Sequence, residues 1–327
     1  MPRPGPIVFF GTPVFAVPTL DAMAAAGLAP DLVVTQPSRP SGRGRRVELP
    51  PVGKWAEERE IELVQVPRVR DPEFLEDLAG REPWVGVVVA FGQIFPQTLL
   101  DVPKAGCVNL HASLLPRHRG AAPVQAALVA GDEVTGVCVM RMEKGLDTGP
   151  VYACRETRIK PGETADALGH RLAVLGGELM ARTLAAIAAG DAVAVPQDDT
   201  LATWAPRIEK ADGRVDWGWS ARELVNRYRG YTPWPGLTAS LDGRPVKLLD
   251  VVLAALDAES GTGAGAFHGL GGAGALVECG DGSLVAIGRL QRPGRRALTA
   301  AEFVNGERLA PGTRFDSAPG AGGGTGR

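Results

Sequence analysis

Residues 7–13 read Ile7-Val-Phe-Phe10-Gly11-Thr12-Pro13, a short apolar run that leads directly into a turn. Two similar apolar runs follow at Leu32–Thr35 and Val85–Phe91, and Thr135–Met142 alternates small and large residues. Nearly continuous apolar runs of this length are typical of strands that are buried on both faces of a parallel sheet. We therefore expect these segments to form the central sheet of the fold.

Helical patterns separate the strand-like runs. One begins near Pro13 and ends at Gly27, and a second covers Val52–Glu60. The longest, Thr164–Ala189, repeats leucine every three or four residues until Gly190 ends it. Strands that alternate with helices predict an α/β domain over residues 1–190, with a Rossmann-like, doubly wound parallel sheet.

The turn after the first strand argues against a nicotinamide cofactor. A dinucleotide-binding turn carries three glycines between the first strand and its helix. Only Gly11 is present here. We therefore predict a Rossmann-like fold that does not bind a nicotinamide dinucleotide.

The pattern changes after residue 190. Residues 191–206 contain a polar run at 196–200 and are expected to form a linker. Ser220-Ala-Arg-Glu223 is a capping box, which predicts a short helix ending near Gly230. Short β-type runs follow, at Leu237–Leu241, Val246–Leu253, Ala275–Cys279 and Leu284–Ile287.

Asp242-Gly243 and Asp281-Gly282 separate these runs as hairpin turns. Residues 207–313 are therefore predicted to form a small β-barrel. Residues 314–327 end in a Gly-rich stretch and are expected to be a disordered tail.

Composition limits the class of protein. The 327 residues are 45% hydrophobic and 22% charged, with a formal net charge of −2, which is normal for a globular chain of two domains. We find no apolar run that predicts a membrane span and no secretory signal at the N-terminus, so we expect a cytoplasmic protein. Nothing in the sequence requires more than a monomer.

The four cysteines are Cys107, Cys138, Cys154 and Cys279. None forms a Cys-x-x-Cys pair, and no histidine lies at ligand spacing from them, so no metal site is predicted. We expect all four to be small buried side chains with free thiols in a reducing compartment.

Residues 107–149 carry the candidate chemistry. Asn109 and His111 are two residues apart on a short apolar strand, so their side chains share one face. Asp147 lies between two glycines in the turn Gly145-Leu-Asp-Thr-Gly149. Taken singly, such a histidine is usually a packed side chain and such an aspartate a turn former. Open α/β sheets place their chemistry where strands end in loops, so the three groups are predicted to converge.

The order of these elements carries a resemblance. Asn109-x-His111, Ser113-Leu-Leu-Pro116, Arg119-Gly-x-x-Pro123 and the turn around Asp147 follow one another as they do in the family of formyltransferases that use 10-formyltetrahydrofolate. Farther on, 213–217 and 233–236 resemble the start of the C-terminal OB-like domain of the methionyl-tRNA formyltransferases. The resemblance implies transfer of a formyl group to the α-amino group of methionyl-initiator tRNA, for translation initiation.

The resemblance also implies roles for the site residues. An amine attacks the formyl carbon, and the oxyanion that develops needs hydrogen-bond donors. Asn109 and His111 are implied to be these donors. Asp147 is implied to orient the imidazole and to favour its charged form. No metal is implied.

Two segments resemble the folate-binding parts of the family. They are Phe91, Gly92, Gln93 and Ile94 after one strand, and Ser113, Leu114, Leu115 and Pro116 after the next. For Phe91 and Ile94, simple burial in the core is an equally good interpretation.

A basic loop follows the second strand. Residues 35–46 carry Arg39, Arg43, Arg45 and Arg46 among Pro, Ser and Gly, with no hydrophobic anchor. A solvated surface loop is one interpretation. The other is a segment that binds RNA, because the loop resembles the insertion by which methionyl-tRNA formyltransferases contact the acceptor stem.

Several alternatives stay open. The acceptor could be a sugar amine or another small amine, water could replace the amine, or the chain could be an RNA-binding protein without catalysis. The basic loop and the intact Asn109, His111 and Asp147 argue against these. Whether the arginines of 289–296 contact RNA is open, and His118 is expected to pack at the surface.

Overall fold

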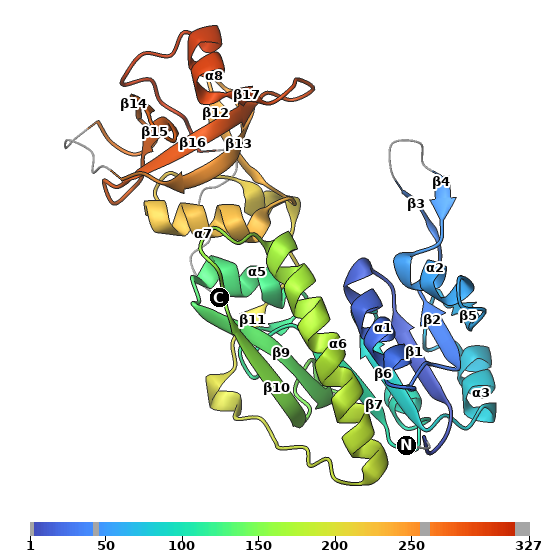
Figure 1. The fold of residues 1–327 in the computed structure, drawn as a ribbon. Helices are drawn as coiled ribbons and strands as arrows, with labels where there is room; N and C mark the ends of the chain where they lie inside the picture. The colour runs from blue at the N-terminus through green and yellow to red at the C-terminus, as the bar shows by residue number, and fades with distance from the viewer. Residues whose placement is uncertain (1–2, 42–45, 256–261, 318–327) are drawn as a thin grey trace. The chain divides into compact units, whose positions relative to one another are not determined.

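The computed structural model describes residues 3–41, 46–255 and 262–317, and only the backbone at 39–41 and at Arg46 (Figure 1). The chain divides into two compact units. The first comprises residues 1–123, 134–159 and 167–206, and the second comprises residues 124–133, 160–166 and 207–327.

The first unit is built on a seven-stranded sheet with the order β10-β9-β7-β6-β1-β2-β5. The strands are β1 (Ile7–Gly11), β2 (Leu32–Thr35), β5 (Glu62–Gln65), β6 (Val85–Val89), β7 (Cys107–His111), β9 (Val134–Arg141) and β10 (Val151–Arg158). β5, β2, β1, β6 and β7 are parallel, which confirms the predicted parallel core. β9 and β10 run antiparallel at one edge, so the sheet is mixed rather than wholly parallel.

Helices cover both faces of this sheet. They are α1 (Val17–Ala25), which follows a 3-10 turn at Val14–Ala16, α2 (Pro51–Glu57), α3 (Pro72–Gly80), α4 (Gln97–Leu100) and α6 (Ala165–Ala189). Phe74 of α3 and Leu99 of α4 share one hydrophobic cluster with Phe10 and Cys107 of the sheet. Leu110, on the opposite face of β7 from Cys107, lies against α6. The predicted doubly wound arrangement is confirmed.

The chain order places a topological switch point between β1 and β6. The chain leaves β1 for β2 and β5, then returns past β1 to form β6 on its other side. Open α/β sheets bind ligands at the carboxyl ends of the strands beside such a point. β7, with Asn109 and His111, is the next strand along.

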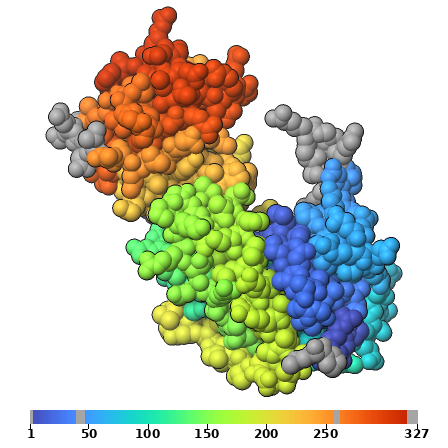
Figure 2. Space-filling view, in the orientation of Figure 1, coloured from blue at the N-terminus to red at the C-terminus, as the bar shows by residue number. Residues whose placement is uncertain are grey.

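Helix α6 begins and ends within one residue of the predicted bounds. By length and composition it is apolar enough to cross a membrane, with half of the relevant window buried inside the protein. A side chain at Gly177 would collide with the backbone of Pro18, which shows how closely α6 approaches α1. Figures 1 and 2 show the two helices lying side by side.

The second unit contains an antiparallel sheet with the order β12-β13-β16-β15-β14, and β17 pairs with β16. The strands are β12 (Leu237–Leu241), β13 (Arg244–Leu253), β14 (Phe267–Gly271), β15 (Gly274–Glu278), β16 (Leu284–Gln291) and β17 (Leu298–Thr299). The helices are α5 (Pro123–Ala130), α7 (Ala221–Tyr231) and α8 (Ala300–Glu307). Ser220 and Glu223 cap each other's backbone at the start of α7, as predicted.

The first residues of the expected tail, 314–317, are part of the second unit. Arg314 pairs with Ala266 beside β14, and Asp316 pairs with Ser240 of β12, so this segment joins the two edges of the sheet. Phe315 lies between them with 1% of its surface exposed, in the core of the unit. The segment is ordered because it supplies both backbone partners for the sheet edges and an apolar side chain for the core. The rest of the expected tail, from residue 318, lies outside the described residues.

The stretch expected to be a linker is packed into the first unit. Val195 pairs with Val151, and β11 (Trp204–Ala205) pairs with β8 (Arg119–Gly120). Its polar residues suggested a solvated connection, but they make hydrogen bonds to the loops of the first unit, as described below.

The arginine-rich loop has β-structure at its base. β3 (Arg39–Ser41) and β4 (Arg46–Glu48) form an antiparallel pair. Arg43 and Arg45 lie outside the described residues, and only the backbone is described for Arg39 and Arg46.

The prediction of four free thiols is wrong for one pair. Cys138 of β9 and Cys154 of β10 form a disulfide. The two residues are direct partners across the antiparallel strands, which brings their side chains to the same face. The sequence did not show this bridge, because the two sulfur atoms come within bonding distance only when β9 pairs with β10. Cys107 and Cys279 are free and buried.

Candidate functional site

The site is built at the carboxyl end of β7. Asn109 pairs with Val88 of β6 on one side and Met140 of β9 on the other, so its backbone is held in the middle of the sheet. Its side chain is partly exposed. Within the described residues, the structure records no hydrogen bond of this side-chain amide. The amide is therefore accessible to a ligand at this position.

His111 is held by a hydrogen bond at one ring nitrogen, and the described residues record no hydrogen bond at the other. The imidazole is nearly buried, with 6% of its surface exposed. Its Nε2 atom lies 2.9 Å from the carbonyl oxygen of His118. A carbonyl oxygen only accepts hydrogen bonds, so Nε2 carries a proton and Nδ1 is the nitrogen left for chemistry.

His118 does not pack at the surface as expected. It is buried, with 6% of its surface exposed. Its backbone carbonyl binds His111, and its N–H donates to Oγ1 of Thr203 at 2.8 Å. The loop sequence alone could not show this, because Thr203 is 85 residues away in the chain.

The structure brings Asp147 to His111. Oδ2 of Asp147 lies 3.7 Å from Nδ1 of His111 and accepts a hydrogen bond of 2.9 Å from the backbone N–H of Gly120. Asp147 adopts a left-handed backbone conformation with φ 54°. This carboxylate can therefore stabilise a positive charge on the imidazole, as well as shape the turn.

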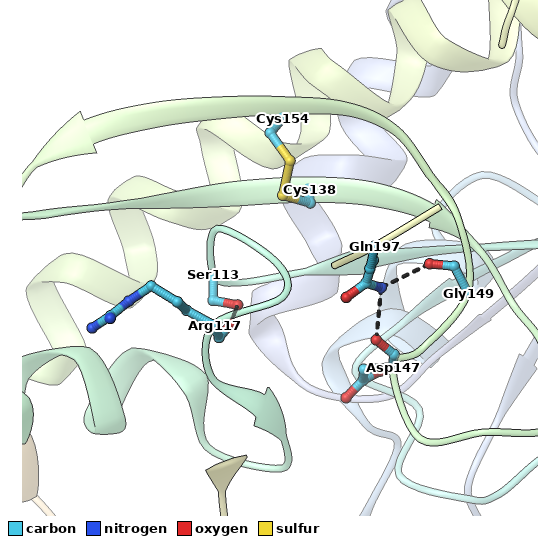
Figure 3. The surroundings of a disulfide bond; sticks show 7 residues. All are labelled: Ser113, Arg117, Cys138, Asp147, Gly149, Cys154 and Gln197. Carbon is cyan, nitrogen blue, oxygen red and sulfur yellow. Dashed lines mark hydrogen bonds between the residues drawn. A yellow bond between two sulfur atoms is a disulfide. The ribbon is translucent and has the colours of Figure 1, made fainter. Parts of the chain in front are cut away.

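Gln197 was not predicted as a site residue. Its Nε2 donates to the carbonyl oxygens of Asp147 at 2.9 Å and Gly149 at 2.7 Å (Figure 3). Its Oε1 accepts from the buried Arg119 at 3.0 and 2.8 Å. The only sequence signal was a polar run within the expected linker, and such runs are usually solvated.

The first segment expected to bind folate has a mixed environment. Phe91 is 2% exposed and packs edge-to-face with Phe10 and Phe95, so it belongs to the core. Ile94, by contrast, is 84% exposed. The Gln93 side chain accepts from the N–H of Val69 at 3.0 Å and so holds the loop in place.

Gly92 in this segment has a structural reason to be glycine. Its φ is 82°, and a Cβ atom there would lie 2.9 Å from Nε2 of Gln36. Gln36 in turn donates to the carbonyl oxygen of Phe91 at 2.7 Å. The loops after β2 and β6 are therefore joined beside the switch point.

The second folate segment forms the loop after β7. Ser113 is fully buried and donates to the carbonyl oxygen of Arg117 at 2.6 Å. Leu114, Leu115 and Pro116 are partly exposed, and the bond before Pro116 is cis. Because β6 and β7 are neighbours, both predicted segments leave the sheet at adjacent positions.

The disulfide lies beside this site. Cys138 is the direct partner of His111 across β7 and β9, so the His111, Cys138 and Cys154 side chains share one face of the sheet. Figure 3 shows the bridge on its two strands, with the Ser113 loop next to it.

Three of the four arginines of residues 289–296 form ion pairs. Arg292 makes two contacts of 2.9 Å with Glu307, Arg296 lies 3.1 Å from Glu302, and Arg289 binds Asp250. Two of these ion pairs, those of Arg289 and Arg296, are largely exposed, and exposed ion pairs contribute little, so the contacts leave open whether these arginines bind RNA.

The described part of the chain offers no evident metal centre. Among these residues, no three or more histidine, cysteine, aspartate or glutamate side chains are grouped in a way that could hold a metal ion. The arrangement of His111, Asp147 and Asn109 can instead move a proton and donate hydrogen bonds.

Family models match both parts of the chain. The formyl transferase model matches residues 6–184, and the model of the formyl transferase C-terminal domain matches residues 207–308. The chain is 46% identical over 312 residues to a methionyl-tRNA formyltransferase of Geobacter sulfurreducens, covering 95% of this chain and 97% of the relative. It is 47% identical over 317 residues to that of Myxococcus xanthus, covering 96% and 98%.

Solved structures share the fold at low sequence identity. WlaRD, a sugar 3N-formyl transferase crystallised with dTDP and 5-N-formyl-THF, has a TM-score of 0.63 at 16% identity, covering 89% of this chain and 98% of that one. An N-formyltransferase from Helicobacter canadensis has a TM-score of 0.62 at 15% identity, covering 86% and 98%.

Proposed function

The chain belongs to the formyl transferase family, as a relative of the methionyl-tRNA formyltransferases, and from this premise we propose how its own residues carry out the reaction. It transfers the formyl group of 10-formyltetrahydrofolate to the α-amino group of methionyl-initiator tRNA. One N–C bond forms to the amine, and the bond from the formyl carbon to N10 of the folate breaks. The amine must lose a proton, and N10 must gain one.

We propose that the His111–Asp147 pair moves this proton. With Nε2 held as a donor by the His118 carbonyl, Nδ1 of the neutral imidazole is free to accept the proton of the attacking amine. The resulting cation is stabilised by the Asp147 carboxylate, 3.7 Å away. Nδ1 can then return the proton to N10 as the tetrahedral intermediate collapses.

Asn109 is proposed to stabilise the oxyanion. Its amide lies on the same face of β7 as His111 and is accessible. The protonated imidazole supplies the second donor while the intermediate exists. The geometry of His111, with one nitrogen bound to a backbone carbonyl and the other 3.7 Å from a carboxylate, is the observation that carries this mechanism.

For the folate we propose the two loops that follow β6 and β7. The exposed side chain of Ile94 favours contact with a ligand, because an isoleucine with no role in the core gains by covering an apolar ring. Gly92, Gln93 and Ser113 would act mainly by shaping the loops, and Leu114, Leu115 and Pro116 by lining the site. The buried Phe91 supports the site from within the core.

For the tRNA we propose the segment that carries Arg39, Arg43, Arg45 and Arg46, together with an OB-like domain over residues 207–313. Guanidinium groups can bind phosphates and base edges. The catalytic domain is proposed to cover residues 1–190 together with residues 191–206, which pack into the same unit. The enzyme is proposed to act as a monomer that does not enter a membrane.

We also propose a cytoplasmic location, where aminoacylated initiator tRNA is used. The Cys138–Cys154 disulfide argues in the other direction, because disulfides persist mainly in oxidising compartments. Counting thiols in freshly prepared protein, as described in the Discussion, addresses this conflict.

A transfer assay tests the proposed function. The purified chain is incubated with 10-formyltetrahydrofolate and with methionyl-initiator tRNA, a sugar amine, or no acceptor. We expect formylmethionyl-tRNA to form, with little product from the sugar amine and little formate release. Faster transfer to the sugar amine would favour a small-amine enzyme, and formate release alone would favour a hydrolase. No reaction in any arm would favour an RNA-binding protein.

A further inference from the structure

The segment from Gln197 to Ala205 contacts the catalytic loops at several points. Gln197 binds the turn that carries Asp147, and Thr203 accepts from the N–H of His118. Arg119 donates its backbone N–H to the carbonyl oxygen of Thr203 at 2.9 Å, and Ala121 donates to that of Ala205 at 2.8 Å. The segment therefore holds the loop that carries the His118 carbonyl, which binds His111, and the Gly120 N–H, which binds Asp147.

The orientation of the Gln197 amide is fixed by its partners. The guanidinium of Arg119 only donates hydrogen bonds, so it must face Oε1 of Gln197. The carbonyl oxygens of Asp147 and Gly149 only accept, so they must face Nε2. All of these partners fix the same orientation of the amide. A carboxylate could accept from Arg119 but could not donate to the two carbonyl oxygens, and an apolar side chain could do neither.

The Gln197 contacts bear directly on the backbone of Asp147. Asp147 has a φ of 54°, a conformation that non-glycine residues adopt at a cost and that the surrounding structure must hold. Nε2 binds the carbonyl of Asp147 itself and that of Gly149 two residues later. These two bonds therefore hold the turn at Asp147 and two residues after it.

Arg119 makes this arrangement rigid. Its side chain is only 4% exposed, and it also binds Asp199, whose side chain is 80% exposed. Gly120, which donates to Asp147, is the next residue. Two groups hold Asp147: the N–H of Gly120 binds its carboxylate, and Nε2 of Gln197 binds its backbone carbonyl. The Arg119–Gln197 contact links these two groups.

We propose that Gln197 is a positioning residue for the formyl transfer. It keeps the Asp147 carboxylate at the distance from His111 at which it stabilises the charged imidazole. The inference rests on the proposed roles of His111 and Asp147. It assigns a catalytic purpose to a residue of the stretch between the two family-model matches, residues 185–206.

The test combines two substitutions of Gln197 with Asp147→Asn. Gln197→Met keeps the length of the side chain and removes every polar contact. Gln197→Glu keeps an acceptor for Arg119 and removes both donors to the turn. Asp199→Asn is the matched control, because it alters the exposed partner of the same arginine without touching the turn. Circular dichroism and thermal unfolding confirm that each variant is folded.

We expect kcat to fall at least about tenfold in both Gln197 variants, since small displacements of catalytic groups cost up to about 10²-fold. KM for 10-formyltetrahydrofolate should stay within about twofold of the wild type, on the same reasoning. The pH–rate profile should change as it does in Asp147→Asn. Asp199→Asn should retain near-normal kcat. If Gln197→Met does not fold, Gln197→Glu carries the comparison.

The double variant, Gln197→Met with Asp147→Asn, distinguishes a positioning role of Gln197 from a general loss of structure. If Gln197 acts through Asp147, adding Gln197→Met to Asp147→Asn should lower kcat little further, because the coupled effects are not additive. Full additivity, or a normal kcat for Gln197→Glu, would overturn the inference while the role of Asp147 stands. A normal kcat for Asp147→Asn itself would overturn the proposed carboxylate role and this inference with it.

Discussion

At the scale of single residues, the site depends on which atoms are already occupied. Nε2 of His111 is bound to a backbone carbonyl, whereas its Nδ1 lies 3.7 Å from a carboxylate. Asn109 lies two residues earlier with an accessible amide. The nearby residues Cys107 and Ser113 are buried and contribute to the core and to the loop instead.

The two proposed oxyanion donors should be sensitive to truncation. We expect Asn109→Ala and His111→Ala each to lower kcat by about 10²-fold or more, the usual cost of losing one donor to an oxyanion. Folate binding should be largely retained. Steady-state kinetics and a direct folate-binding titration measure the two effects separately. Near-normal turnover in either variant would contradict the assignment of that residue.

Asp147 should matter for its charge as well as its place in the turn. Asp147→Asn keeps the shape of the side chain but cannot stabilise a charged imidazole. We expect a lower kcat and an altered pH–rate profile, measured over the range in which histidine titrates. A normal rate with an unchanged profile would mean that Asp147 only forms the turn.

At the scale of elements, the β3–β4 hairpin is a candidate recognition device attached to the sheet. Its two strands pair with each other, outside the main sheet. We expect the arginine-rich segment between β2 and α2 to bind tRNA without taking part in the chemistry of Asn109, His111 and Asp147. Recognition of tRNA and catalysis should be separable by substitution.

Arg43 offers the test of that separation. Its neighbours in the sequence are both glycine, which lets the guanidinium approach a nucleic acid closely. We expect Arg43→Ala to weaken kcat/KM for methionyl-tRNA by about 1–3 kcal/mol, the range for one good base contact. Transfer to a minimal amine acceptor should be unaffected.

The salt dependence of kcat/KM for tRNA should also become shallower in this variant, because fewer phosphate contacts remain. Arg182→Ala, at an exposed position of α6, is the control for loss of one positive charge. Equal losses with tRNA and the small acceptor would show that the hairpin supports the active site rather than RNA binding.

At the scale of the whole molecule, the state of the four cysteines can be measured directly. Cys138 and Cys154 are bridged, while burial raises the pKa of the Cys107 and Cys279 thiols to about 12, from an ordinary value of 9.0. A raised pKa leaves almost no thiolate near pH 8, and the thiolate is the reactive form.

We therefore expect iodoacetamide at pH 8 to label almost no cysteine in the native protein. After unfolding without a reductant, two cysteines per chain should react, and after reduction all four. Mass spectrometry of the intact chain counts the labels. Four labels without a reductant would contradict the disulfide, and rapid labelling of the native protein would contradict the burial of Cys107 and Cys279.

Local sequence determined most of the architecture. The apolar run Ile7–Phe10, the leucine spacing of α6 and the Ser220–Glu223 capping box each specify their element through neighbouring residues, and the structure confirms them. The spacing of Asn109 and His111 placed both on one face for the same reason. The family resemblance, carried by residues 109–149, pointed to the reaction.

Tertiary structure decided what depends on residues far apart in the chain. The Cys138–Cys154 bridge requires β9 beside β10, and the order around Arg314–Asp316 requires both free edges of a sheet. Gln197 meets Asp147 across 50 residues, and Thr203 meets His118 across 85. Periodicity and local propensity do not predict such long-range contacts, because the contacts form only when the packed sheet brings its loops together. The sequence predicted Asn109, His111 and Asp147 as site residues, and the fold shows which distant residues contact His111 and Asp147.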